Sequence, residues 1–415
     1  MHVEKAPQCP CSHRRAQFLA IERCVSEQAS QGCSAIEQGA AVAVAFQTAK
    51  AASEFGMGIA FFSGLIFLLR PSRMTIDARD DRLTLATLTS QPSFRVQTHV
   101  AYDADEQARN LHGWNQTYDQ LTAGCFVGGL TELCVDHMQV FVETTSHTLR
   151  QTCEVQKDAY WFGIPTCPLG TGRIDAQTIS ADALAFRQGG IEFELLTSAG
   201  YEIFGVVVTG EVLRRYAAEV EGVSLDERLP NTEVVSIGAQ RKEQLCALLR
   251  QLLAGGAASG ASLTSTARDS MQASVLASLF DAGALSAAEQ LAMPARPRRQ
   301  SIVWEARDYV LANRDRAINV PELCEQLHVS RRTLQYCFQD VLNMAPATYL
   351  RAIRLNGARR DLSNAARESR SVQDVAAAWG FWHLSQFATD YRKMFGMRPS
   401  ETLRAAAGRQ AGLAH

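Results

Sequence analysis

Two short segments near the C-terminus carry side chains suited to contacting nucleic acid. The first is "SRRTLQYCFQDVL" (residues 330–342) and the second is "LSQFATDYRK" (residues 384–393). Arginine forks and glutamine amides match the donor and acceptor pattern of base edges in the DNA major groove. We expect base contacts from Arg331, Arg332, Gln335, Tyr336, Ser385, Gln386 and Thr389. Four further cations are expected to contact phosphates: Arg351, Arg354, Arg392 and Lys393. Such contacts fix the position of the protein on DNA but do not read the base sequence.

Apolar spacing predicts the helices that must hold the first set. One apolar face ends before residues 328–330, and a second begins after them. The residues concerned are Val320, Leu323 and Leu327, followed by Leu334, Phe338 and Val341. Ser330 is a natural N-cap for the second helix. The pattern therefore predicts two short helices that share a core across a tight turn.

The same pattern recurs around the second segment. The apolar anchors are Val372, Val375, Ala376 and Trp379, then, after a turn at Gly380, Phe387, Tyr391 and Phe395. Between the two pairs, "APATYLRAIRLNGARRDLSN" (residues 345–364) predicts one connecting helix that begins at a proline. Two recognition helices in one chain favour DNA half-sites about one helical turn apart, ~34 Å or 10 to 10.5 base pairs. The aromatic residues of the second pair, Trp379, Phe381, Trp382 and Phe387, are interpreted as core and turn packing rather than a stacking platform.

Charge is divided unevenly along the 415 residues, whose formal net charge is −2. Residues 296–404 contain 18 Lys and Arg against 11 Asp and Glu, a net of +7, whereas residues 1–295 contain 22 against 32, a net of −10. A basic C-terminal module joined to an acidic body indicates a polyanionic partner for that module.

The N-terminal half shows a different pattern. Short β-like runs lie between Gly, Pro, Asn and Ser signals, at spacings that predict a small antiparallel barrel or sandwich. These runs are residues 126–143, 158–165, 191–197 and 201–208. From Glu211 the apolar period becomes three to four, which predicts helices. The fold class expected is therefore α+β, with a β-sheet domain and a helical segment before a C-terminal all-α domain.

The C-terminal segment closely resembles the DNA-binding domain of AraC/XylS-family bacterial transcription regulators. The resemblance rests on "AAAWGFWHLSQFATDYRKMFGMRPSETLR" (residues 376–404), which is similar to that family's terminal signature. It departs at Tyr391, where Phe is usual, and at Thr402, where an aromatic residue is expected. The resemblance implies a double helix-turn-helix domain, binding to double-stranded DNA, and activation through contact with RNA polymerase more often than repression.

The N-terminal half resembles the cupin-like sensor of the same family. The run "HGWNQTYDQLTAGCFVGGLTEL" (residues 112–133) is similar to the opening of sensors such as that of the ethanolamine-utilisation operon regulator. A small-molecule effector is therefore expected, in a pocket with aromatic walls. Its candidate lining is Trp114, Tyr118, Phe141, Trp161 and Phe193, all of which suit a barrel core equally well. Residues 243–254 and 271–280 are candidates for a homodimer contact or for packing within one chain.

An alternative makes the barrel a metal-dependent cupin enzyme fused to a DNA-binding domain. Against it, His99, His112, His137 and His147 lack the clustered metal-ligand spacing of such enzymes, and no nucleophile motif occurs. We therefore expect a non-enzymatic protein with no cofactor, no metal and no catalytic residue. The irregular spacing of the 11 cysteines favours a reducing cytoplasm with mostly buried thiols, and the expected binding to DNA implies association with the nucleoid. No apolar run is long enough to span a membrane.

The expected boundaries follow from these patterns. Residues 1–73 are interpreted as a poorly ordered or spurious extension, and residues 74–235 as the cupin-like sensor. A helical dimerisation region (236–292) and a linker (293–300) precede the DNA-binding domain (301–405) and a tail (406–415).

Overall fold

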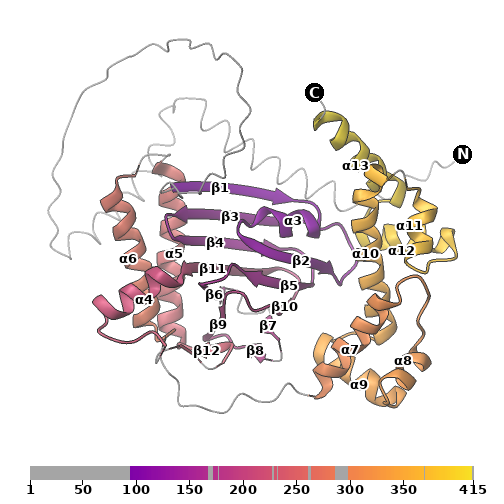
Figure 1. The fold of residues 1–415 in the computed structure, drawn as a ribbon, viewed down its shortest axis with the longest axis horizontal. Coiled ribbons are helices and arrows are strands. Elements are labelled where there is room, and N and C mark those ends of the chain that lie inside the picture. Colours follow the sequence, from indigo (N-terminus) through magenta and orange to yellow (C-terminus); the bar gives the residue numbers. More distant parts are fainter. Residues whose placement is uncertain are drawn as a thin grey trace, which may run out of the picture. The chain divides into compact units, whose positions relative to one another are not determined.

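The computed structural model describes residues 94–413, apart from 167–171, 176, 227–228, 231, 260–262, 286–297 and 369. The interpretation of residues 1–73 lies outside the described part of the chain. Residues Thr89–His415 belong to one compact unit. Among the described helices, none is both long enough and apolar enough to cross a membrane. The architecture is α+β, with a β-sheet domain followed by a helical C-terminal domain (Figure 1).

The β-sheet domain contains two antiparallel sheets. The larger has the strand order β1-β3-β4-β11-β6-β9-β12, and the smaller has the order β2-β5-β10-β7-β8. The larger sheet consists of β1 (Phe94–Ala101), β3 (Gly128–Val135), β4 (Met138–Thr145), β11 (Tyr201–Thr209), β6 (Ala159–Pro165), β9 (Ala183–Gln188) and β12 (Val234–Ser236). The smaller consists of β2 (Trp114–Gln120), β5 (Leu149–Val155), β10 (Phe193–Thr197), β7 (Gly172–Ile174) and β8 (Gln177–Ile179). The two sheets do not join, so a closed barrel is wrong and the sandwich alternative fits the described strands.

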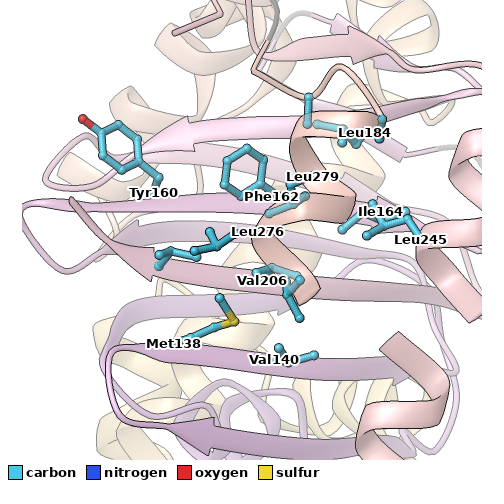
Figure 2. Close-up of a cluster of buried hydrophobic side chains, with 14 of the residues drawn as sticks. Met138, Val140, Tyr160, Phe162, Ile164, Leu184, Val206, Leu245, Leu276 and Leu279 are labelled. Carbon is cyan, nitrogen blue, oxygen red and sulfur yellow. The ribbon is translucent and has the colours of Figure 1, made fainter. Parts of the chain in front are cut away.

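Both faces of the larger sheet are buried, which explains why its central strands read as unbroken apolar runs. Along β6, Tyr160, Phe162 and Ile164 face a helical layer, whereas Trp161 faces the smaller sheet. The helical layer consists of α4 (Gly210–Glu219), α5 (Ala239–Ser259) and α6 (Ser265–Asp281), and a short helix, α3 (Ala104–Asn110), precedes β2. Figure 2 shows strand side chains packed against the helices through Leu276 and Leu279.

Packing within the chain uses the apolar residues of α5 and α6. Leu245, Leu249 and Leu253 of α5 are buried in the core formed with the larger sheet. Val275, Leu276 and Leu279 of α6 belong to the same core. The apolar side chains that suggested a dimer contact therefore have partners within the protomer.

The C-terminal domain consists of seven helices in the described residues. They are α7 (Arg298–Ala312), α8 (Val320–Gln326), α9 (Arg331–Leu342), α10 (Pro346–Glu368), α11 (Val372–Ala378), α12 (Leu384–Phe395) and α13 (Pro399–Leu413). The predicted anchors share one core: Leu323, Leu334, Phe338, Val375, Ala376, Trp379, Phe387, Tyr391 and Phe395 are all buried there. The connecting helix predicted from Pro346 is α10, which packs against both helix pairs.

Cysteines in the described part of the chain are mostly thiols. The free thiols are Cys134 and Cys324, which are partly buried, and Cys153, Cys246 and Cys337, which are buried. Cys125 is disulfide-bonded, so the expectation of free thiols does not extend to it.

Gly357 provides a test of the packing around α10. A Cβ atom at Gly357 would lie 2.1 Å from the ring of Trp379, whose indole nitrogen donates to Asp361 over 3.0 Å. Gly→Ala inside a helix normally stabilises by about 0.5–1 kcal/mol. We expect Gly357→Ala to lower the free energy of unfolding instead, by about 1–3 kcal/mol, because the ring must move.

Gly408 on α13 is the matched control, since nothing lies within 4 Å of a Cβ atom built there. Gly408→Ala should leave stability unchanged or raise it slightly. Denaturant unfolding of both variants measures the difference, and a Gly357→Ala protein as stable as Gly408→Ala would contradict the packing described.

Candidate nucleic-acid interface

The first helix pair places one face of α9 in the core and the other in solvent. Ser330 caps the helix as predicted, since its hydroxyl accepts from the backbone N–H of Thr333 over 3.0 Å. The preceding turn contains His328 with a positive φ of 52°, and only four residues, 327–330, separate α8 from α9. Leu334 and Phe338 are fully buried on the inner face.

All predicted base-contacting residues of α9 are exposed. They are Arg331, Arg332, Gln335 and Tyr336, and the neighbouring Gln339 is exposed beside them. Arg332 donates to the Tyr336 hydroxyl over 3.3 Å, and its guanidinium lies 5.3 Å from the centre of that ring. This contact joins positions i and i+4, so the two side chains are held together on the outer face.

The second helix pair repeats the arrangement on α12. Ser385, Gln386 and Thr389 are exposed, while Phe387 and Tyr391 are buried. Gln386 donates to Asp390 over 2.9 Å, and the Thr389 hydroxyl donates to the Ser385 carbonyl over 2.8 Å. In the free protein these two side chains therefore already have partners on their own helix.

The four predicted phosphate contacts have different surroundings. Arg392 and Lys393 are exposed on the last turn of α12, where they line a shallow groove together with Thr389, Ala388 and Arg398. Arg398 was not predicted, because it follows the helix and no helical spacing connects it to the others. Three cations and a hydroxyl in one groove suit a backbone phosphate.

The other two cations lie on α10. Arg351 is exposed and forms an ion pair with Asp390 at 3.2 Å. Arg354 is half-buried, donates to the Trp379 carbonyl over 2.9 Å and lies 4.5 Å from the ring centre of Phe381. Its guanidinium thus holds the turn that leads into α12.

The interpretation of Trp382 as packing is wrong. Its side chain is 68% exposed, and Leu384 beside it is 42% exposed, whereas Trp379 and Phe387 are buried as expected. The turn at Gly380, with a φ of 66°, directs residue 382 away from the core. A spacing rule could not have found this, because residues 380–383 lie between the helices.

The two departures from the family signature contact each other. Tyr391 and Thr402 are both buried, and their hydroxyl oxygens lie 2.8 Å apart. A phenylalanine at 391 could not make this hydrogen bond, and a large aromatic residue at 402 would replace the hydroxyl. The smaller residue at 402 is thus matched by the added hydroxyl at 391.

The candidate effector residues lie together between the sheets. Trp114 contacts three rings edge-on, with centroids 5.9 Å from Phe141, 5.7 Å from Trp161 and 6.4 Å from Phe193. Trp161 stacks on Phe193 at 5.0 Å. Room for these rings comes from two glycines paired across β6 and β11, Gly163 and Gly205, where a Cβ atom would lie 2.3 Å from Trp161 and 2.0 Å from Phe141.

A buried carboxylate lies beside this aromatic cluster. Glu143 accepts from the Tyr118 hydroxyl over 3.1 Å and from Gln107 over 2.9 Å. Burial raises the pKa of Glu143 to about 7, although both hydrogen bonds favour the charged form. Sequence spacing did not single out Glu143, because a glutamate on a strand usually faces solvent. The described residues contain no group of three or more His, Cys, Asp or Glu side chains that could hold a metal ion.

The family model that matches this chain lies within the helical domain. Residues 323–405 match a family model described as "Helix-turn-helix domain". Over 109 residues the chain is 38% identical to the "Probable thc operon regulatory protein" of Rhodococcus erythropolis, which covers 26% of this chain and 33% of that protein. Over 95 residues it is 37% identical to the "XylDLEGF operon transcriptional activator 2" of Pseudomonas putida, covering 23% of this chain and 60% of that protein.

A solved structure described as a probable AraC family transcriptional regulator from Rhodopseudomonas palustris is 34% identical. It covers 26% of this chain and 97% of that chain, with a TM-score of 0.24. The chain spans a third of the first curated relative and three fifths of the second. Both relatives are named as regulators, and neither name supports the metal-dependent enzyme alternative.

The pair of hydroxyls at positions 391 and 402 gives a double-mutant test. Tyr391→Phe and Thr402→Val should each lower the free energy of unfolding by about 1 kcal/mol, because each removes one partner of a buried hydrogen bond. The double variant should lose less than the sum, with a coupling energy of about 0.5–3 kcal/mol. Denaturant unfolding of all four proteins measures this coupling, and strictly additive losses would contradict it.

Glu143 makes a prediction about pH. Its pKa is raised in the folded protein from an ordinary value of 4.5 to about 7, so the native state binds the proton more tightly. The free energy of unfolding must therefore fall as pH rises through this window. Glu143→Gln removes the titration, and we expect it to gain stability relative to wild type between pH 5 and pH 8, by at most about 3 kcal/mol.

The exposed Glu192 of the same domain is the control for that series. Glu192→Gln should give an unfolding free energy that tracks wild type at every pH. If Glu143→Gln also ran parallel to wild type, the burial described for this carboxylate would be contradicted.

Proposed function

We propose that this chain, whose C-terminal domain is a helix-turn-helix domain of the AraC/XylS type, is a transcription regulator that binds two adjacent half-sites of double-stranded DNA. One observation carries the proposal. Two helices, α9 and α12, each bury an apolar face and expose a polar one, and both pack on the same connecting helix α10. Two recognition helices in one chain suit successive turns of one groove.

In this proposal the exposed side chains near the start of each recognition helix read bases. Arg331, Arg332, Gln335 and Tyr336 would read one half-site, and Ser385, Gln386 and Thr389 the other. Gln386 and Thr389 must exchange their partners on α12 for base edges, and that exchange lowers the net gain from each contact.

Phosphate contacts are proposed for Arg351, Arg392 and Lys393, with Arg398 added from the groove that they share with it. Arg354 is proposed to act indirectly. Its hydrogen bond to the Trp379 carbonyl holds the turn that starts α12, so it orients the helix even without reaching DNA itself.

The sensing half of the proposal rests on the sheet domain. A cupin-like sensor that binds a small effector is supported by the resemblance of residues 112–133 and by the aromatic cluster of Trp114, Phe141, Trp161 and Phe193. Tyr118 and Glu143 add hydrogen-bonding groups next to it. A homodimer and contact with RNA polymerase are proposed from the resemblance, in a cytoplasmic activator, without an assigned contact surface.

Selection of DNA sites from a random pool by the full-length protein tests the proposal at two salt concentrations. Two recurring boxes about one helical turn apart, with affinity falling steeply as salt rises, are expected. Enrichment of no sequence at either salt concentration would overturn the proposed function.

Two substitutions separate base contacts from phosphate contacts. Arg332→Ala should cost about 1–3 kcal/mol of binding and relax the preference at one base position. Lys393→Ala should weaken binding to all sequences and lower the salt slope by about 1. Arg215→Ala, an exposed arginine on α4, is the control and should change neither quantity.

A further inference from the structure

The C-terminal ends of both recognition helices are held by side chains and backbone of the β-sheet domain. At the end of α9, Arg173 of β7 donates to the Asp340 carbonyl over 3.0 Å and lies 3.4 Å from the Val341 carbonyl. At the end of α12, the Met394 carbonyl accepts from the Gln120 side chain and from the Gly124 backbone, both over 3.0 Å.

Helix chemistry explains why these contacts hold the helices. The last four carbonyls of an α-helix have no partner within the helix, and they form the negative end of its dipole. Arg173 supplies a cation and hydrogen bonds to one helix end, and two N–H donors supply hydrogen bonds to the other. The N-terminal ends, from which recognition helices read bases, remain exposed at Arg331 and Ser385.

A third contact lies between these two, on the connecting helix. The Asn356 side-chain amide donates to the Gln120 carbonyl over 2.8 Å and accepts from the Gln120 N–H over 3.0 Å. This pairing satisfies the backbone of the last residue of β2 as a neighbouring strand would. Both residues are buried, so an unpaired amide there would cost about 1–3 kcal/mol.

Ion pairs and apolar contacts surround the amide. Arg359 pairs with Asp103 at 2.5 Å, and Arg360 pairs with Asp119 at 2.9 Å. Arg307 of α7 pairs with Glu194 of β10 at 3.2 Å. Leu121 is buried within the core of the helical domain. The β-sheet domain therefore touches α7, α9, α10 and α12.

We propose that Arg173, Gln120 and Asn356 are positioning residues, through which the β-sheet domain fixes the separation of α9 and α12 and thereby the spacing between the two DNA half-sites. The proposal rests on the proposed function, and it adds that spacing is a property of the whole chain rather than of the helical domain alone. Without these contacts, α9 and α12 are connected only through the helical domain's own core and can shift relative to one another.

The test is selection of DNA sites by the full-length protein, as wild type and as Arg173→Ala and Asn356→Ala variants. The quantity measured is the number of base pairs between the two boxes in each enriched sequence. Wild type should enrich one spacing. Both variants should enrich the same two boxes, with unchanged base preferences, over a range of spacings.

A binding titration measures the same dependence on spacing as a fold-change in affinity for DNA. On a DNA whose boxes are moved two base pairs from the best spacing, wild type should lose about tenfold or more in affinity. Such a loss, ~1.4 kcal/mol, is within the cost of deforming DNA to restore the fit. The variants should lose less than about threefold on the same DNA.

Arg214→Ala is the matched control, because Arg214 pairs with Asp158 inside the β-sheet domain and should keep the wild-type spacing. Arg173→Ala removes no buried amide pair, so it keeps the test decisive even if Asn356→Ala fails to fold. Wild-type spacing in folded Arg173→Ala protein would overturn the inference while leaving the proposed function intact. Absence of paired boxes for wild type itself would overturn both.

Discussion

Enclosure of the middle of α10 is the constraint on which the rest of this structure depends. None of residues 352–362 is exposed, although this stretch includes Arg354, Arg359 and Arg360. A helix with no solvent face must satisfy every charge that it carries, because a buried ion without a partner costs several kcal/mol. Asp103, Asp105 and Asp119 of the β-sheet domain supply partners for two of these arginines, and the Trp379 carbonyl supplies one for the third.

This arrangement changes the meaning of the basic charge in the C-terminal third. The net charge of +7 in residues 296–404 suggested a polyanionic partner for the whole module. Arg307, Arg359 and Arg360 instead pair with carboxylates of the acidic half of the chain. Exposed cations remain on both recognition helices, at Arg331 and Arg332 of α9 and at Arg392 and Lys393 of α12, so fewer charges are available to DNA than composition suggests.

Much of the helical domain could be predicted from the sequence, because its buried apolar residues recur at the spacing of an α-helix. Leu334, Phe338, Phe387 and Tyr391 repeat every four residues, and each is buried. The four predicted β-like runs correspond to β3, β4, β6, β10 and β11, whereas β1, β2, β5, β7, β8, β9 and β12 lie outside them. In β2 (WNQTYDQ) polar residues dominate, and the partners of the buried Asp119 and Gln120 include Arg360 and Asn356, more than 200 positions away. Local spacing cannot contain that information.

The same limit applies to exposure at the recognition helices. Periodicity predicted which side of α9 faces solvent. The exposure of Trp382 depends instead on the turn at Gly380, and it was wrongly predicted to be packed. In the β-sheet domain, alternation predicted strands but could not decide between one closed barrel and two sheets. That choice depends on pairing between strands distant in sequence, such as β4 with β11.

Strand β2 connects the aromatic interior of the β-sheet domain directly to the helical domain. Its successive side chains point to opposite faces, so Tyr118 packs in the aromatic interior beside Glu143 while Asp119 binds Arg360 on the connecting helix. The interior and the helical domain are thus separated by a single peptide unit, about 3.3 Å of backbone. The hydrogen bond to Glu143 in the interior and the ion pair that joins β2 to α10 therefore start from neighbouring residues.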